Sequence, residues 1–431
     1  MFGTSGIRGI YGKDVTEALA RKISAVFAGD RLVLGMDIRE SGPPLSRAVA
    51  EGAAMMGADV ISCGIVPTPT LALATKRHSC RGIMVTASHN PPEYNGLKLI
   101  EGGKEIGKAE EAAVVKKYGE PLEPGPGGGG FFHDEATGRH KELASGMVDA
   151  ARIAKKAPKI IVDCNGAGAA ITPFLLTDLG CRVVSVNSSM LCFNRESEPG
   201  LESLGYLPGL IKASGADFAI AHDGDGDRCI VFDEAGEMLP LDVQLAIMIE
   251  HELKSGRKRI VSTVESSLVI REVVEKAGGK IDITPVGSTY VGDRLEESGA
   301  DFGGEPAGEY IYKAGVHVPD AVVAAAKFAE IFSEEGKFSL IRRKYRTNTM
   351  VREKFPAQDK LGAIEKIRGE VRVRGQVRND DGIRVDEEDG WFLIRASGTE
   401  PIIRLTMEYR DKGKAGVRKA ELSALIKKFT S

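Results

Sequence analysis

The hydrophobic positions at the start of the chain fall into short runs rich in Val, Ile and Leu, separated by stretches with helical spacing. The runs predict buried strands, and the stretches between them predict helices. Strands that alternate with helices indicate parallel sheets covered on both faces. The first three runs are RLVLGMD from Arg31, GADVISCGIVPTP from Gly57 and CRGIMVTASHN from Cys80.

The same order of runs returns twice. In the second member of each set, a glycine after the helical stretch indicates the cap that ends the helix. The spacing is regular although the sequence identity is slight, so we interpret the sets as three tandem α/β domains. The later runs are PKIIVDCNGAG from Pro158, GCRVVSVNSS from Gly180, GADFAIAHDGDGD from Gly215, KRIVSTVESS from Lys258, GGKIDITPVGS from Gly278 and GADFGGEPAGE from Gly299.

The chain departs from this repeat after about residue 345. Strands are predicted around TNTMVREKF, GIRV, WFLIRASG and IIRLTMEY, with a helix after the first strand and another at the end, which is typical of an α+β domain. We predict an α/β fold of three tandem α/β domains with mixed, mostly parallel sheets, followed by this C-terminal α+β domain. The predicted boundaries are 1–145, 146–237, 238–345 and 346–431.

Composition narrows the class of protein. The 58 Lys and Arg against 61 Asp and Glu leave a net charge of −3, so we expect no nucleic-acid partner. The chain has no apolar run of about 18 residues and does not open with a signal-peptide pattern, so we expect no membrane segment and a cytoplasmic protein. The six cysteines form no CxxC pair, which favours reduced thiols over zinc sites or disulfides.

Polar, glycine-rich sequence ends the third run of each set, as TASHN, DGDGDR and GEPAGE. Ligands of open parallel sheets bind at the carboxyl ends of the strands. We therefore expect these three segments to occupy equivalent positions and to converge on one central cleft.

Three carboxylates alternate with glycine in HDGDGDR, at Asp223, Asp225 and Asp227. Their mutual repulsion favours a bound hard cation over the alternative, a solvated acidic turn. A calcium-binding EF-hand loop is excluded, because Arg228 stands where that loop requires glycine and the flanks are strand-like.

Ser88 lies in TASHNPPEYNGLK, between a predicted strand end and an Asn-Pro turn, with His89 beside it and Lys98 further on. This segment exposes a hydroxyl among candidate proton carriers and cations, although an ordinary turn explains it equally simply. The GxSxG pattern of serine hydrolases is absent.

Two further glycine-rich segments carry cations and hydroxyls. RASGTEP at 395–401, with Arg404 beyond it, suits a phosphate dianion, and the alternative is a glycine turn between strands with exposed arginines. FGTSGIRG at 2–9 contains Thr4, Ser5 and Arg8, and the alternative is a frayed N-terminus.

Taken in order across the whole chain, FGTSGIRG, TASHNPPEYNGLK, DGDGDR, GEPAGE and RASGTEP resemble the motifs of the α-D-phosphohexomutase superfamily. The first and last motifs are most similar to the archaeal-type phosphoglucosamine mutase branch, and less to the phosphomannomutase and phosphoglucomutase branch. The resemblance implies four domains around a deep cleft. It also implies an enzyme that interconverts hexose 6-phosphates and 1-phosphates through a phosphoserine and a hexose 1,6-bisphosphate, which serves as intermediate and activator.

The resemblance assigns roles to matched positions. Ser88 carries the phosphoryl group, and Mg²⁺ binds the three aspartates and a phosphoserine oxygen. Catalytic roles in proton shuttling and charge stabilisation fall to Arg8, His89 and Lys98. Substrate-binding roles fall to Arg228 near the phosphoserine, to Gly304 and Glu305 in the sugar loop, and to Arg395, Ser397, Gly398, Thr399 and Arg404 in the loop that grips the non-reacting phosphate.

The sugar loop departs from the family pattern of Gly, Glu, any residue, Ser, Gly, His. Ala307 replaces the Ser and Glu309 replaces the His. A carboxylate at 309 could bind the ammonium of a glucosamine phosphate; the alternatives are that it points to solvent or pairs with a lysine. We expect the substrate to be glucosamine 6-phosphate, with mannose or glucose phosphates as the alternative.

Two competing classes remain open at this stage. A sugar-phosphate-binding protein without activity would need no nucleophile, so an intact Ser88 with all three aspartates disfavours it. A metal-dependent phosphatase would release phosphate instead of interconverting isomers. The expected partners are small-molecule hexose phosphates, and both a monomer and a homodimer are compatible with the sequence.

Overall fold

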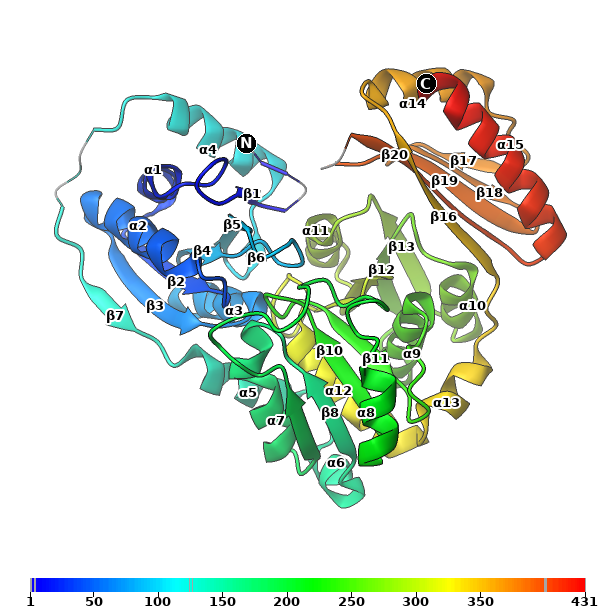
Figure 1. The fold of residues 1–431 in the computed structure, drawn as a ribbon, viewed down its shortest axis with the longest axis horizontal. Helices are drawn as coiled ribbons and strands as arrows, with labels where there is room; N and C mark the ends of the chain where they lie inside the picture. Colours follow the sequence, from blue (N-terminus) through cyan, green and yellow to red (C-terminus); the bar gives the residue numbers. More distant parts are fainter. Residues whose placement is uncertain (1, 4, 124, 126, 399–400, 431) are drawn as a thin grey trace.

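The computed structural model contains four β-sheets that follow one another along the chain, each with its own helices (Figure 1). We number the domains I to IV in that order. In Figure 1, domain IV, in orange and red, stands beside domain III and apart from domain I. The structure describes residues 2–3, 5–123, 125, 127–398 and 401–430.

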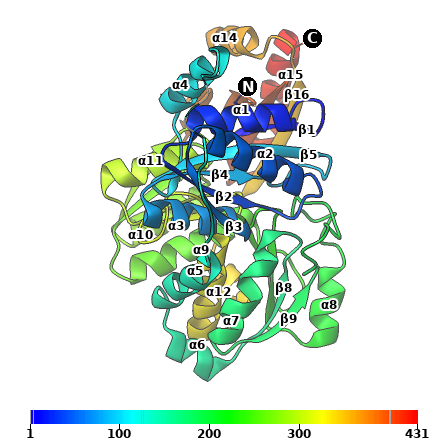
Figure 2. The ribbon, with the colours of Figure 1, turned by 90° about the vertical axis from the view of Figure 1, so that its left-hand side faces the viewer.

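Domain I is built on a seven-stranded sheet in the order β1-β5-β4-β2-β3-β7, with β6 added beside β5. Helices α1, α2 and α4 cover one face and α3 covers the other, as the alternating burial of the strands requires (Figure 2). The elements are β1 (Ile7–Ile10), α1 (Glu17–Phe27), β2 (Arg31–Met36), α2 (Gly42–Met55), β3 (Asp59–Ile65), α3 (Thr68–His78), β4 (Arg81–Val85), β5 (Tyr94–Glu101), β6 (Lys104–Glu105), α4 (Lys108–Gly119) and β7 (Phe131–His133).

Domain II has a four-stranded sheet in the order β11-β10-β8-β9, in which β11 alone is antiparallel to its neighbour. Its elements are α5 (Ala136–Gly146), α6 (Ala150–Lys156), β8 (Lys159–Asp163), the 3₁₀ helix η1 (Ala167–Ala170), α7 (Thr172–Asp178), β9 (Arg182–Val186), α8 (Leu207–Ser214), β10 (Phe218–His222) and β11 (Cys229–Phe232).

Domain III repeats this arrangement in the order β13-β12-β14-β15, again with one antiparallel strand at the edge. Its elements are α9 (Leu241–Lys254), β12 (Arg259–Thr263), α10 (Leu268–Lys276), β13 (Lys280–Thr284), α11 (Ser288–Ser298), β14 (Phe302–Glu305), β15 (Glu309–Tyr312), α12 (Ala321–Glu335), α13 (Phe338–Ile341) and the 3₁₀ helix η2 (Arg342–Lys344).

The internal repeat predicted from the hydrophobic runs is confirmed by these sheets. Domain I contains the same four-strand unit as β3-β2-β4-β5, with β5 antiparallel. In every unit the third parallel strand connects directly to the antiparallel one. These equivalent connections hold Ser88 between β4 and β5, the aspartates between β10 and β11, and Pro306 to Gly308 between β14 and β15.

Domain IV is α+β, as predicted: a five-stranded antiparallel sheet in the order β16-β20-β19-β18-β17 with two helices on it. Its elements are β16 (Thr349–Pro356), α14 (Lys360–Glu370), β17 (Gln376–Arg378), β18 (Ile383–Glu387), β19 (Gly390–Ala396), β20 (Ile402–Tyr409) and α15 (Lys412–Thr430).

The domains differ in how firmly they are joined. A single apolar cluster runs through domains II and III, where α12 packs on α6, α7 and α9. Domain IV has a separate core and meets domain III through a smaller cluster around the buried Trp391. There Trp391 Nε1 donates to Glu408 at 2.8 Å, and the Arg384 guanidinium lies 3.9 Å from the indole ring centre.

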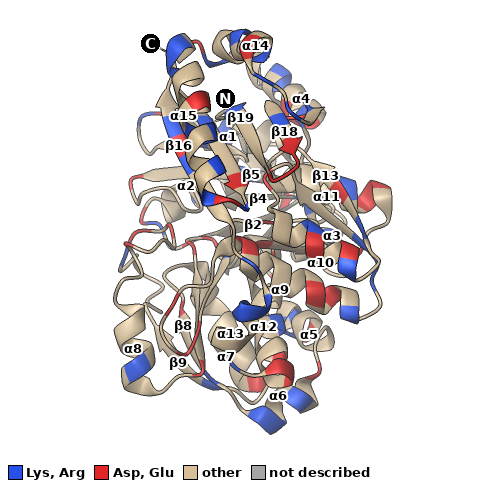
Figure 3. Ribbon diagram, turned by 90° about the vertical axis from the view of Figure 1, so that its right-hand side faces the viewer, with Lys and Arg blue, Asp and Glu red and all other residues tan. Residues whose placement is uncertain are grey.

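Acidic and basic residues are interspersed over the side of the molecule drawn in Figure 3, in keeping with the net charge of −3. Within the described part of the chain, no helix is both long enough and apolar enough to cross a membrane.

Candidate active site

Ser88 is buried in the β4–β5 connection and has a left-handed backbone, with φ of 50°. Such a conformation costs a non-glycine residue about 1 kcal/mol or more, so its surroundings must hold it. The Ser88 N–H donates to Thr86 Oγ1 at 2.8 Å, and the Ser88 carbonyl accepts from Arg39 at 2.7 Å and from Ser197 Oγ at 2.6 Å. The serine side chain is thereby aimed at domain II.

Arg39 organises the whole Ser88 connection. Its buried guanidinium donates to four backbone carbonyls of that connection and to the Asp37 carboxylate at 3.0 Å, which in turn accepts from Thr86 Oγ1 at 2.6 Å. A guanidinium has enough donors to satisfy all of these acceptors at once. The four carbonyls belong to Ser88, Asn90, Pro91 and Tyr94.

The three predicted cation ligands, Asp223, Asp225 and Asp227, are buried together in the β10–β11 connection, with one carboxylate oxygen of each within 4.8 Å of the others. Ser88 Oγ donates to Asp223 Oδ2 at 2.8 Å. Gly224, between Asp223 and Asp225, lets the β10–β11 connection lie this close to Ser88, because a Cβ at position 224 would be 2.6 Å from the Ser88 carbonyl oxygen.

The donor set fits a hard divalent cation. The Oδ1 atoms of Asp225 and Asp227 are buried and accept no hydrogen bond from the described residues. Buried carboxylate oxygens without partners are costly unless a cation binds them. A serine oxygen beside three carboxylates is an all-oxygen set, which Mg²⁺ prefers.

Lys98 supplies the positive charge nearest to this cluster. Its Nζ lies 2.8 Å from Asp225 Oδ2 and 2.7 Å from Asp227 Oδ2. Burial alone would lower the pKa of Lys98, but the two carboxylates outweigh it and raise the pKa, so Lys98 stays an ammonium. Burial and the repulsion of Asp227 and Asp225 raise the pKa of Asp223 well above its usual value.

His89 faces the Ser88 hydroxyl, with Nδ1 3.4 Å from Ser88 Oγ. Burial and the neighbouring Arg228 and Arg8 guanidinium groups lower the pKa of His89 to about 2. His89 is therefore a neutral imidazole near pH 7, while Lys98 carries a positive charge.

The N-terminal loop packs against the same site, so it is not a frayed end where the structure describes it. Arg8 donates to Ser5 Oγ at 3.2 Å and to Asn90 Oδ1 at 3.4 Å. Ser5 in turn donates to Glu105 at 2.8 Å, and Glu105 lies 3.8 Å from Lys98 Nζ. Thr4 lies outside the described residues.

Arg228 links the aspartate connection to the sugar loop. It pairs with Glu309 at 3.3 Å and with Glu198 at 3.0 Å. Glu309 faces Glu305 across the β14–β15 hairpin, and Glu305 accepts the Gly287 N–H at 3.0 Å. Neither alternative for Glu309 holds, because its partner is an arginine. Burial and the facing Glu309 raise the pKa of Glu305 well above its usual value.

Gly304 is required by the sugar-loop hairpin. A Cβ at this position would lie 2.7 Å from the Glu309 carbonyl oxygen and 2.8 Å from Leu245 Cδ1.

In domain IV, Arg395 on β19 and Arg404 on β20 are direct cross-strand partners, so their side chains share one face of the sheet. Arg395 pairs with Asp381 at 3.1 Å and reaches Glu265 of domain III at 3.7 Å. Ser397 is buried, with its N–H donating to the Ile402 carbonyl and its own carbonyl accepting from Lys360. Gly398 is exposed, and Thr399 lies outside the described residues.

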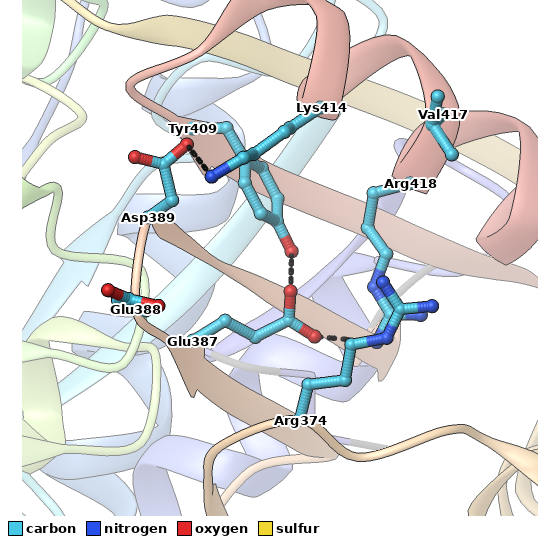
Figure 4. Close-up of a pocket in the computed structure, with 8 residues that line it drawn as sticks. All are labelled: Arg374, Glu387, Glu388, Asp389, Tyr409, Lys414, Val417 and Arg418. Carbon is cyan, nitrogen blue, oxygen red and sulfur yellow. Dashed lines mark hydrogen bonds and ion pairs between the residues drawn. The ribbon is translucent and has the colours of Figure 1, made fainter.

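The structure thus brings the predicted residues of domains I, II and III into one contact network. Between described residues, no hydrogen bond or ion pair joins Arg395 to Ser88 or to the aspartates. A cavity of about 350 Å³ in domain IV is lined by none of the predicted residues. It lies between α15 and the β18–β19 turn, where Glu387 binds Tyr409 and Arg418 (Figure 4).

Sequence reasoning missed Arg39, Ser197, Thr68 and Glu105, which hold the site from outside the motifs. Thr68 stands in VPTPT at a predicted strand end. Because ligands of parallel sheets bind at strand ends, this position could have marked Thr68 as a candidate site residue. Arg39 also follows a strand by a few residues, whereas nothing in the sequence around Ser197 marks it.

Family models of the phosphoglucomutase/phosphomannomutase type match the chain in four consecutive segments. Alpha/beta/alpha domain I matches residues 1–123, domain II 140–236, domain III 241–345, and the C-terminal domain 350–424. A solved phosphoglucomutase/phosphomannomutase family protein from Burkholderia thailandensis superposes with a TM-score of 0.88 at 27% identity, covering 98% of this chain and 96% of that one.

The fold and the site define an α-D-phosphohexomutase, and the chain belongs to the phosphoglucomutase/phosphomannomutase family. Within it, the chain is of the phosphoglucosamine mutase type. "Probable phosphoglucosamine mutase" from Methanosarcina acetivorans is 37% identical, with 96% of both chains covered. The protein of the same name from Thermococcus kodakarensis is 33% identical, with 100% of this chain and 99% of that one covered. The resemblance noted in the sequence is confirmed.

Proposed function

We propose that this protein interconverts glucosamine 6-phosphate and glucosamine 1-phosphate, through a phosphoserine at Ser88 and a glucosamine 1,6-bisphosphate. The observation that carries the proposal is the 2.8 Å hydrogen bond from Ser88 Oγ to Asp223, beside carboxylate oxygens that accept no hydrogen bond from the described residues. A hydroxyl held in a cation site is placed to carry a phosphoryl group there.

In each transfer the phosphorus–Oγ bond of phosphoserine 88 breaks and a phosphorus–oxygen bond to a sugar hydroxyl forms. The sugar hydroxyl loses its proton and Ser88 Oγ gains one as its bond to phosphorus breaks. His89, whose Nδ1 lies 3.4 Å from Ser88 Oγ, is assigned to this exchange of protons. The Lys98 ammonium and the Arg8 guanidinium stabilise the charge on the moving group. The second transfer reverses these steps and returns the other phosphate to Ser88.

Mg²⁺ is the cation that we assign to Asp223, Asp225, Asp227 and the Ser88 oxygen, where it would offset the negative charge of the phosphoryl group during transfer. The buried all-oxygen donor set supports this assignment. The hexose 1,6-bisphosphate then serves as activator, since it can phosphorylate Ser88 of an unphosphorylated chain.

The phosphate that does not react is bound by Arg395, Ser397, Gly398, Thr399 and Arg404. The sugar is bound by the loop that contains Gly304 and Glu305. The arginines of β19 and β20 support the first assignment, because their side chains share one face of the sheet and guanidinium groups bind phosphate through paired, charge-assisted hydrogen bonds. Arg228 connects the sugar loop to the phosphoserine. The domain boundaries of this proposal are 145, 237 and 345. Residue 237 lies between the segments that the family models match, 345 is the last residue of the domain III segment, and 145 lies within the domain II segment, which begins at residue 140.

Intact mass spectrometry tests the central step. Incubation with glucose 1,6-bisphosphate should add one phosphate to the wild type, and peptide mapping should place it on Ser88. Ser88→Ala should gain no phosphate and lose mutase activity at least about a thousandfold while keeping its far-UV circular dichroism.

The measurement separates the alternatives. Wild-type turnover in Ser88→Ala would refute the phosphoserine mechanism. Net release of phosphate without isomer exchange would indicate a phosphatase, and tight binding of sugar phosphates without turnover would indicate a binding protein. Coupled assays with the 1-phosphates of glucosamine, glucose and mannose decide which hexose is preferred.

A further inference from the structure

Helix α3 of domain I begins directly against the aspartates of domain II. Its first residue, Thr68, is completely buried. The Thr68 N–H is one of the amides at a helix start that have no partner within the helix, and it donates to the Asp225 carbonyl at 2.9 Å. The Thr68 hydroxyl donates to Asp225 Oδ2 at 2.5 Å. One residue therefore binds both the backbone and the side chain of Asp225.

These contacts distinguish the two carboxylate oxygens of Asp225. Oδ2 accepts from Thr68 and lies 2.8 Å from Lys98 Nζ, whereas Oδ1 is buried and accepts no hydrogen bond from the described residues. A carboxylate with one oxygen fixed by two donors presents the other oxygen in a defined direction.

The start of α3 is itself held in place. Thr70, in the same turn, shares a 2.8 Å hydrogen bond with His140 of α5, and His140 lies 2.9 Å from Asp320 at the start of α12. The preceding Pro67 packs on Gly226, where a Cβ would lie 3.1 Å from its ring. Elements of domains II and III thus fix the turn that carries Thr68.

We propose that Thr68 is a positioning residue for the cation site, which orients Asp225 so that Oδ1 is the oxygen offered to the divalent cation. This inference rests on the proposed function for the presence of a cation, and it adds a residue of domain I that touches neither substrate nor cation. Thr68 makes the affinity for the cation depend on the contact between domains I and II.

The test is titration of the full-length protein with Mn²⁺, followed by the electron paramagnetic resonance signal of the free ion. Thr68→Val removes the hydroxyl while keeping the shape of the side chain, and it should weaken Mn²⁺ binding about 10- to 100-fold. Thr68→Ser keeps the hydroxyl and should stay within about threefold of the wild type. Thr68→Ala should match Thr68→Val, and it decides the matter if the valine variant does not fold.

Thr75→Val is the matched control. Thr75 is equally buried in α3, and its hydroxyl donates to the Ala72 carbonyl at 2.7 Å and accepts the Gly103 N–H at 3.1 Å, away from the aspartates. This variant should lose stability but keep wild-type affinity for Mn²⁺.

Equal affinity of Thr68→Val, Thr68→Ala and wild type would overturn the role of Thr68 and leave the proposed function standing. Equal weakening in Thr68→Val and Thr75→Val would also overturn it, because loss of packing would then explain the effect. A wild type that binds no Mn²⁺ would overturn this inference together with the cation of the proposed function.

Discussion

Ser88, the proposed carrier of the phosphoryl group, is held by neighbours to which we assign no part in the chemistry. Its left-handed backbone is held by donors to its carbonyl from Arg39 and Ser197, and its hydroxyl is held by Asp223. Because three separate segments fix one residue, its Oγ keeps one position relative to the cation ligands. Reaction rates of positioned groups fall steeply with small displacements.

Asp225→Asn removes one of the crowded carboxylate charges. We expect Mg²⁺ affinity and turnover to fall about a hundredfold, while the free energy of unfolding changes little, because the substitution also relieves repulsion with Asp223 and Asp227. Isothermal titration with Mg²⁺ and urea unfolding measure the two effects. Activity of the wild type that survives excess chelator would show that the aspartates serve another purpose.

Glu309 tests the choice of hexose. Glu309 pairs with Arg228 and lies opposite Glu305 on the sugar loop. A substrate ammonium that reaches the Glu309 carboxylate would gain a charge-assisted hydrogen bond of about 1.5 to 3 kcal/mol. Glu309→Gln should therefore reduce the preference for glucosamine 1-phosphate over glucose 1-phosphate in kcat/KM about 10- to 100-fold. An unchanged ratio would mean that Glu309 serves only to hold Arg228.

At the scale of elements, the site is assembled from equivalent strand connections in domains I, II and III. The turn after the third parallel strand carries the serine in domain I, the aspartates in domain II and the sugar loop in domain III. The repeated strand order and the polar strand ends could be predicted from the sequence, because strand periodicity and glycine-rich strand ends are local signals.

The residues that hold these connections could not be predicted in the same way. Arg39 contacts the Ser88 carbonyl across 49 positions, Ser197 across 109, and Thr68 contacts Asp225 across 157. The first pair depends on how domain I folds, and the other two depend on how domains I and II dock. No local pattern of hydrophobic and polar residues encodes either. The partner of Glu309 was missed for the same reason, since Arg228 approaches it from another domain.

The β19–β20 pair carries the proposed phosphate handle. Arg404→Ala should raise KM for the sugar phosphate about 10- to 100-fold, because it removes a charge-assisted contact that persists through both transfers. Ser397→Ala should raise KM less, since it removes a neutral hydroxyl. Steady-state kinetics with circular dichroism as a control for folding measure both, and an unchanged KM in both variants would move the phosphate site elsewhere.

At the scale of the whole molecule, domains II and III form one body through a shared core, and domain IV is attached through the small cluster around Trp391. The chain has one tryptophan, so its fluorescence reports on that junction alone. Domain IV carries the proposed phosphate handle, while the proposed nucleophile, Ser88, lies in domain I.

Urea unfolding should therefore proceed in two steps. The emission of Trp391 should shift to the red at a midpoint at least about 0.5 M below the loss of far-UV circular dichroism, because the III–IV junction buries less apolar surface than the shared core. Coincident transitions would instead make the four domains a single cooperative unit. Glu408→Gln, which weakens the acceptor of the Trp391 N–H, should move the fluorescence midpoint further down.

The contact between Ser88 and Asp223 spans 135 positions. During synthesis on the ribosome, domain I therefore emerges with Ser88 well before the aspartates that we propose as its cation ligands are made. A nascent or truncated chain that holds domain I alone presents this serine without the proposed cation ligands. We therefore expect an unfinished chain that ends before Asp223 to take no part in phosphate transfer.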